Sequence, residues 1–192
     1  EKATGAGAVT QVLPFPPAIA RFGDSGQTNR ARLTLNALAN SPELTSYHRA
    51  LRRYFRQVQP DLVHSNGLKM HVLSALAKPR SAKLVWHMHD YVGSRALISS
   101  LLRPLSSRAD ALIAVSHSVA EDAQRTLRHA NVATILNVVD LDRFSPDGPR
   151  ADLDTLSGLP SCRPGTVRIG LLATMAWWKG HRLFLDAVAK LD

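Results

Sequence analysis

Residues 84–115 read LVWHMHDYVGSRALISSLLRPLSSRADALIAV, and their pattern sets the expected fold class. Two short apolar runs, at 84–89 and 111–115, lie on either side of a segment that favours a helix over 95–107. A strand, a crossover helix and a second strand predict two parallel strands, because parallel neighbours need a crossover connection. The stretch therefore predicts an α/β protein.

The same alternation continues on both sides of this stretch. We expect further strands at 61–64 and 132–136, an extended segment at 9–16, and helices at 27–40, 43–59, 68–77 and 119–127. Ser116 or Ser118 is placed to cap the last helix. Short apolar strands that alternate with helices predict a Rossmann-like parallel sheet with helices on both faces. Ligands of such sheets bind outside the carboxyl ends of the strands.

The pattern changes after residue 136, where a polar, turn-rich segment precedes a short expected helix at 151–159. A new strand at 167–172 and a helix that runs to 191 follow. We expect an N-terminal Rossmann-like domain over 1–149 that lacks its first strand, and a linker over 150–165. Residues 166–192 then form the first strand–helix unit of a second, truncated Rossmann-like domain.

The composition is that of an ordinary soluble globular protein. The chain has 192 residues, of which 45% are hydrophobic and 20% charged, and a single cysteine, Cys162. These values exclude collagen-like, disordered and disulfide-stapled classes. No apolar run approaches the roughly 18 residues of a membrane-spanning helix. We therefore expect a cytoplasmic protein.

The positive charge is concentrated in the first half of the chain. Of the net charge of +9, residues 1–96 carry +8, which favours an anionic partner. On the expected helix at 43–59, a ridge of arginines opposes an apolar stripe; the ridge comprises Arg49, Arg52, Arg53 and Arg56. It is either a solvated outer face or a face that contacts an anionic membrane at the periphery. No nucleic-acid partner is expected, because an aromatic platform and a helix-turn-helix pattern are both lacking.

The run His87-Met88-His89-Asp90 is the first candidate site. Because side chains alternate along a strand, His87 and His89 share one face. Three interpretations stay open. The two imidazoles could bind a metal together with His64, they could be buried or capping residues, or His89 and Asp90 could contact a hydroxylated substrate without metal.

The segment 173–180 is the second candidate site. It joins the expected strand at 167–172 to a helix, so backbone N–H groups and Lys179 could face an anion there. It lacks the glycine spacing of a Walker loop. Trp177 and Trp178 in this segment suit packing equally well.

Five blocks, taken in order, resemble the GT4-type (glycosyl transferases group 1) retaining glycosyltransferases. They are Pro60-Asp61-Leu62-Val63-His64, His87-Met88-His89-Asp90, Ala109-Asp110-Ala111-Leu112-Ile113-Ala114-Val115-Ser116, Asn137-Val138-Val139-Asp140 with Arg143-Phe144-Ser145-Pro146, and Lys179-Gly180. The resemblance implies the GT-B architecture, in which two Rossmann-like domains face each other across a cleft. It covers roughly residues 55–192. The chain departs from the family at Val138, where a glycine is usual, and at Ala173-Thr174, where Gly-Arg is usual.

The resemblance also implies roles for particular residues. His89 and Asp90 would be catalytic, and Lys179, Gly180 and Thr174 would bind the donor phosphates. The remaining cleft positions would be His64, Asn66, Gly67, Ser116, Asn137 and Asp140.

The implied reaction transfers a sugar from a nucleotide-sugar donor to an acceptor such as a lipid-linked sugar or a cell-envelope glycan. It retains the anomeric configuration and uses no metal and no cofactor, since the nucleotide sugar is a substrate. We expect the 192 residues alone to be inactive. The alternatives are a non-catalytic sugar- or nucleotide-binding remnant of the same fold and a metal-dependent hydrolase that uses His87, His89 and His64.

Overall fold

The structure is a computed structural model that describes residues 2–17, 41–129, 131–158, 160 and 163–191. The chain divides into two compact units, Glu1–Val138 and Val139–Asp192. Each unit is described by itself. The predicted domain boundary at 149 and the predicted linker over 150–165 stay predictions, and the helix predicted at 27–40 lies outside the described residues.

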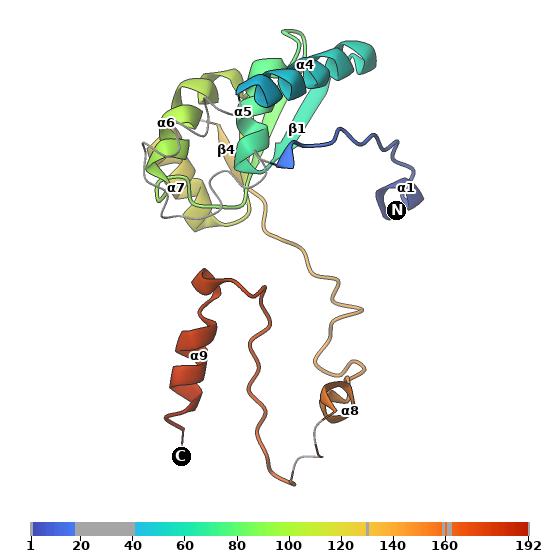
Figure 1. The fold of residues 1–192 in the computed structure, drawn as a ribbon, viewed down its shortest axis with the longest axis vertical. Coiled ribbons are helices and arrows are strands. Elements are labelled where there is room, and N and C mark those ends of the chain that lie inside the picture. Colours follow the sequence, from blue (N-terminus) through green and yellow to red (C-terminus); the bar gives the residue numbers. More distant parts are fainter. Residues whose placement is uncertain (1, 18–40, 130, 159, 161–162, 192) are drawn as a thin grey trace. The chain divides into compact units, whose positions relative to one another are not determined.

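The N-terminal unit is built on a four-stranded parallel sheet in the order β1-β2-β3-β4 (Figure 1). The strands are β1 (Leu62–Asn66), β2 (Lys83–Met88), β3 (Ala111–Ala114) and β4 (Val132–Thr134). In the register, Asn66 pairs with His87 and Met88 with Ala114. The strands therefore end at one common edge, as the sequence predicts for a Rossmann-like α/β fold.

The helices of this unit agree closely with the predicted ones. They are α1 (Lys2–Gly5), α4 (Ser41–Val58), α5 (Leu68–Ala77), α6 (Ala96–Leu105), a 3₁₀ turn (Ser106–Arg108) and α7 (His117–Leu127). Of the two predicted caps of α7, Ser116 is the one observed, because its side chain accepts a hydrogen bond from the N–H of Val119. The helix ends at Arg128, which adopts the left-handed conformation at φ 55°. Residues 8–16 form no helix or strand, and the extended segment expected at 9–16 stays a prediction.

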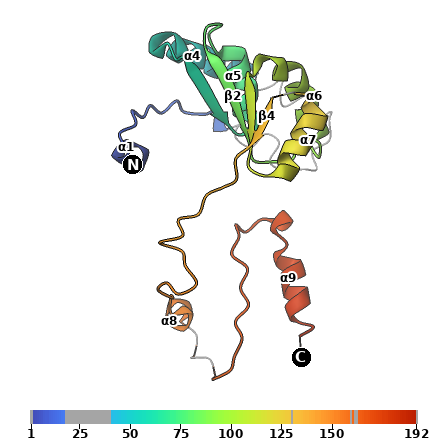
Figure 2. The same cartoon turned by 180° about the vertical axis from the view of Figure 1, so that it is seen from behind.

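One face of the sheet carries the core. Trp86, Leu84, Met88, Leu112 and Ala114 are fully buried in a single apolar cluster. The cluster includes residues of α5, α6 and α7, so all three helices cover this face, as right-handed crossovers between sequential strands require. Figure 1 shows α5 in front of the strands, and Figure 2 shows β2 and β4 from behind.

The alternate side chains of the strands form the second face. His64 is exposed there, and Val85, His87 and Ile113 are half-buried. No described helix contributes to this face in the way that α5, α6 and α7 cover the first. Helices on both faces were expected; among the described residues they are observed on one, and those of the second face stay a prediction.

Helix α4 packs outside α5 through a smaller cluster of Tyr47, Leu51, Leu73 and Ala77. The opposite side of α4 carries the predicted ridge, and all of its arginines are exposed: Arg49, Arg52, Arg53 and Arg56. The amphipathic pattern thus predicted the orientation of the helix correctly. At its C-terminal end the apolar stripe fails, because Val58 is 51% exposed.

The C-terminal unit contains α8 (Leu153–Ser157), a 3₁₀ turn (Trp177–Lys179) and α9 (His181–Val188). The predicted strand at 167–172 is wrong, since these residues form no strand in the structure. A strand exists through hydrogen bonds to a partner strand, and the described part of this unit contains none. In neither unit does a described helix have the length and apolarity to cross a bilayer.

Candidate functional site

The carboxyl edge of the sheet gathers most of the site residues predicted for the N-terminal unit. Asn66 ends β1 and Gly67 starts the turn into α5. His89 and Asp90 follow β2 directly, and Ser116 lies between β3 and α7. Parallel strands place these loops at the same edge, so five residues from three connections share one side of the sheet.

Three histidines form a row on the second face, leading to this edge. The ring centroids of His64 and His87 are 5.3 Å apart, and those of His87 and His89 are 4.4 Å apart. Partial burial lowers the pKa of His87, and the neighbouring rings of His89 and His64 lower it further. Near neutral pH the central ring is therefore an uncharged imidazole, which can both donate and accept a hydrogen bond.

The row does not assemble into a metal site. The His64 and His87 rings stack with an interplanar angle of 23°, rather than pointing their nitrogens at a common centre. Within the described ranges, no three histidine, cysteine, aspartate or glutamate side chains are grouped so that they could hold a metal ion. The hydrolase alternative, which needs His87, His89 and His64 as joint ligands, therefore has no ligand set in this part of the chain.

The turn after β1 depends on the special conformation of Gly67. Its φ of 87° lies in the region that L side chains rarely adopt. Its carbonyl oxygen accepts a hydrogen bond from the N–H of His71, which closes the first turn of α5. The turn therefore needs a glycine at position 67, directly after Asn66, which is the last residue of β1.

Ser65 and His71, which lie on either side of this turn in the sequence, form a buried polar pair that the sequence did not indicate. The Nδ1 of His71 lies 2.8 Å from the hydroxyl oxygen of Ser65, and the ring of His71 stacks on Trp86 at 5.2 Å. Burial lowers the pKa of His71 to about 3, although the backbone carbonyl of His87 acts in the opposite direction. His71 is therefore a neutral core residue at physiological pH. The apolar pattern of α5 gave no signal that this histidine is buried.

The loop after β2, residues 89–94, is held by a second buried group that the sequence analysis missed. Asp122 on α7 is 7% exposed, and its Oδ2 accepts hydrogen bonds from the N–H of Val92 at 2.6 Å and of Gly93 at 3.0 Å. A Cβ at Gly93 would lie 2.5 Å from Asp122 Oδ1, so any larger residue collides with the carboxylate. The available signal was a carboxylate on the apolar stripe of α7, three residues after Val119.

Further contacts join this loop to the start of α7. The hydroxyl of Tyr91 donates to the Ser118 hydroxyl oxygen at 2.9 Å, and the Ser118 and Ser116 hydroxyl oxygens are 3.1 Å apart. Asp90 forms an exposed ion pair with Arg95 at 3.8 Å. The backbone beneath His89 and Asp90 is thus fixed by α7, while both side chains stay open to solvent.

Comparison with known proteins agrees with this arrangement. The model of Glycosyltransferase Family 4 matches residues 9–143, which include the whole carboxyl edge described above. The chain belongs to Glycosyltransferase Family 4. The resemblance drawn from the sequence motifs is therefore confirmed, and glycosyl transfer is the general chemistry of the family. No curated protein sequence matches the chain.

The family 4 match ends before the predicted donor-phosphate residues. In the C-terminal unit, Lys179 ends a 3₁₀ turn and Gly180, at φ 77°, leads into α9. The carbonyl oxygen of Thr174 accepts a hydrogen bond from the N–H of Ala176 at 2.8 Å. Lys179 therefore lies directly before a helix N-terminus, although the strand expected to precede it is missing.

The last two predicted cleft residues lie at the division of the chain. Asn137 is exposed near the end of the N-terminal unit. In the C-terminal unit, Asp140 accepts a hydrogen bond from the N–H of Arg143 through its side chain and from the N–H of Phe144 through its carbonyl. Asp140 thus caps a turn, which is a structural role; its predicted role in the cleft stays a prediction.

Proposed function

We propose that this family 4 chain takes part in transferring a sugar from a nucleotide-sugar donor to an acceptor, with retention of configuration and without metal. The observation that carries the proposal is the family match over the edge that carries His89 and Asp90. Two exposed hydrogen-bonding side chains on a fixed backbone suit recognition of a hydroxylated substrate.

We assign separate tasks to the two units within this proposal. His89 and Asp90 of the N-terminal unit would contact the transferred sugar or the acceptor hydroxyl. The further residues of this unit that we assign to the acceptor side are His64, Asn66, Gly67, Ser116 and Asn137, and the predicted cleft role of Asp140 in the C-terminal unit stays part of the proposal. Lys179, Gly180 and Thr174 would bind the donor diphosphate, where the ammonium group stabilises the charge that develops on the leaving group. The location of Lys179 directly before α9 supports this assignment, because helix N-termini favour anions.

We propose that the acceptor is a sugar or a lipid-linked sugar at an anionic membrane, which the enzyme contacts peripherally. The exposure of all four arginines of the α4 ridge supports this part of the proposal. An acceptor of this kind would also account for the charge of +8 over residues 1–96.

The test is a screen of nucleotide sugars with the full-length gene product, in which release of the nucleotide is measured. His89→Asn should lower turnover by about 100-fold if the imidazole acts on a reacting group. Lys179→Met should chiefly weaken donor binding, with Lys190→Met on the same unit as its control. His129→Asn is the control for His89, because the His129 ring bonds to the Ala109 carbonyl at the other edge of the sheet.

The outcomes separate the proposal from its rival. Loss of turnover in His89→Asn with activity kept in His129→Asn supports the catalytic assignment. A full-length product that binds nucleotide sugars but hydrolyses and transfers none of them would instead identify a non-catalytic binding remnant.

A further inference from the structure

A basic hollow lies at the amino edge of the sheet, opposite to the edge that carries the candidate active site. Its volume is about 300 Å³, at the small end of the range for ligand sites. The segments that enter β2 and β3 line it, so it is built entirely within the N-terminal unit. Its charged lining residues are Lys78, Arg80, Arg108 and Asp110.

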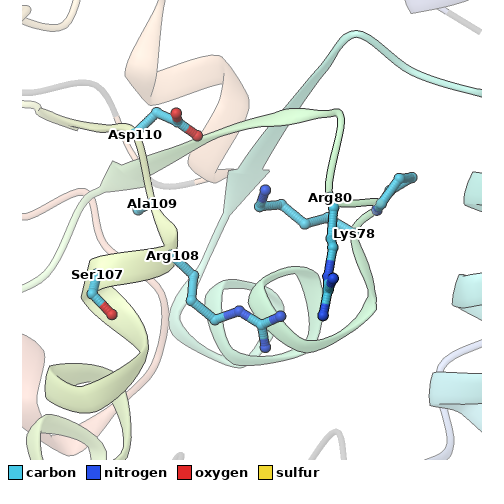
Figure 3. Close-up of a pocket in the computed structure, with 7 residues that line it drawn as sticks. Lys78, Arg80, Ser107, Arg108, Ala109 and Asp110 are labelled. Atoms are coloured by element: carbon cyan, nitrogen blue, oxygen red, sulfur yellow. The ribbon is translucent and has the colours of Figure 1, made fainter.

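The two arginines of this hollow form no ion pair within the part of the chain that the structure describes. Neither Arg80 nor Arg108 makes a hydrogen bond or an ion pair with the residues that the structure describes, and both are exposed. Figure 3 shows their side chains extending toward one another from the two segments. Two guanidinium groups that face a common space repel each other unless an anion lies between them.

The remaining charges do not neutralise the arginines. Lys78 donates a hydrogen bond to the carbonyl of Ala82 at 2.7 Å, which uses one of its three N–H groups. The carboxylate of Asp110 accepts from Lys83 at 2.9 Å and from the N–H of Leu84 at 2.8 Å. Asp110 is thus committed to Lys83 and to the strand, and the hollow keeps an excess of positive charge.

The backbone that carries these cations is fixed. Ala82 and Ala109, which adjoin the two segments, are 2% and 6% exposed. The N–H of Asp110 also donates to the carbonyl of Leu84 at 2.7 Å, which ties one segment to the other strand. A ligand would therefore meet guanidinium groups whose attachment points are already in place, which reduces the entropy lost on binding.

We propose that this hollow binds a phosphate group, either of a small soluble phosphate or of a phospholipid headgroup. Guanidinium groups present paired N–H donors that match phosphate oxygens, and Lys78 adds a third cation. The polar, charged lining is unsuited to an apolar ligand. This site lies at the opposite edge from His89, so it does not depend on the proposed glycosyl transfer.

The experiment compares the wild-type chain with the double variant Arg80→Gln/Arg108→Gln. Binding of inorganic phosphate and of pyrophosphate is measured by calorimetry, and binding of vesicles by flotation. The vesicles contain phosphatidylcholine alone or mixed with phosphatidylglycerol. The matched control is Arg103→Gln/Arg125→Gln, which removes the same charge from exposed positions on α6 and α7. Circular dichroism confirms that all variants are folded.

We expect saturable binding of at least one probe to the wild-type chain. It should weaken at least about tenfold in Arg80→Gln/Arg108→Gln, because this variant loses the charge-assisted hydrogen bonds to phosphate. Binding should stay nearly unchanged in the control pair. Binding of the soluble phosphates identifies a small ligand, and binding of the phosphatidylglycerol vesicles alone identifies a lipid headgroup; both support the site. An equal loss in the two double variants, or no binding of any probe, overturns the proposal.

Discussion

Replacing Asp122 with alanine should loosen the loop that carries Asp90 and lower the free energy of unfolding of the N-terminal unit by about 2–4 kcal/mol. The carboxylate accepts two backbone hydrogen bonds from this loop, and among the described residues these two N–H groups have no other acceptor. The effect therefore follows from leaving two donors without their partner.

The two lost bonds differ in cost. Val92 is fully buried, so its N–H group has no access to water in place of the carboxylate. A hydrogen bond of this kind to a charged acceptor contributes about 1.5–3 kcal/mol. Gly93 is exposed, so water can reach its N–H group and the net loss there is about 0.5–1 kcal/mol. The sum gives the expected range.

Two measurements check this expectation. Urea unfolding followed by circular dichroism gives the change in stability, and amide hydrogen exchange of Val92 and Gly93 reports the loop itself. Exchange at both amides should accelerate more in Asp122→Ala than at amides of the β2–β3 ladder. Glu121→Ala is the matched control, because Glu121 is the exposed neighbouring acid on α7.

Asp122→Asn refines the test. The amide oxygen of asparagine can take the place of Oδ2, which accepts both hydrogen bonds, so the loss of stability should be smaller than with alanine. The reasoning is refuted if Asp122→Ala destabilises no more than Glu121→Ala, or if the two loop amides keep their wild-type exchange rates. Gly93→Ala gives an independent view, because the added methyl group would collide with the carboxylate and should loosen the same loop.

Three further predictions concern other parts of the N-terminal unit. His71 stays neutral in the folded state down to a pKa of about 3, whereas the unfolded residue binds a proton below its ordinary 6.5. Stability should therefore fall as the pH drops from 6.5 toward 3, by at most about 1.4 kcal/mol per pH unit, and His71→Leu should flatten this slope in urea unfolding. Ser116→Ala removes the side-chain bond to the N–H of Val119 and should cost about 1 kcal/mol, with Ser118→Ala as the smaller comparison. The Lys83 ammonium, more than the Leu84 N–H, lowers the pKa of Asp110, so Asp110→Asn should reduce stability at neutral pH and have less effect below its depressed pKa.

Much of the N-terminal fold could be predicted because its signals are local. Short apolar runs predicted the strands, and the starts of α5 and α7 follow from Gly67 and Ser116. The strand predicted at 167–172 failed for the opposite reason. The apolar run at 167–172 was the only signal for this strand, whereas a strand depends on a partner that the described C-terminal unit does not contain.

The candidate site could be predicted in part. The positions of Asn66, His89 and Ser116 at one edge follow from parallel topology, which brings distant motifs together. His64 was expected at the end of its strand but lies inside β1, which continues to Asn66. The stacking of the His64 and His87 rings could not be predicted in the same way, because it depends on the register between β1 and β2. That register argues against the metal interpretation, since stacked rings do not converge on an ion. Contact of His89 and Asp90 with a hydroxylated substrate stays a prediction.

Asp122 and His71, the two buried residues that hold the site, were missed for different reasons. Asp122 interrupts the apolar stripe of α7, which resembles a defect in the pattern, whereas His71 lies in a helix that is apolar on most sides and gives no such signal. A single polar residue on such a stripe costs free energy when it is buried, so it persists where a specific partner offsets that cost. In this chain the partners of Asp122 are the Val92 and Gly93 amides of the loop after β2, and the partner of His71 is Ser65 on β1. The polar interruption of α7 therefore marks the loop after β2 as one that is held in place, and this loop carries His89 and Asp90.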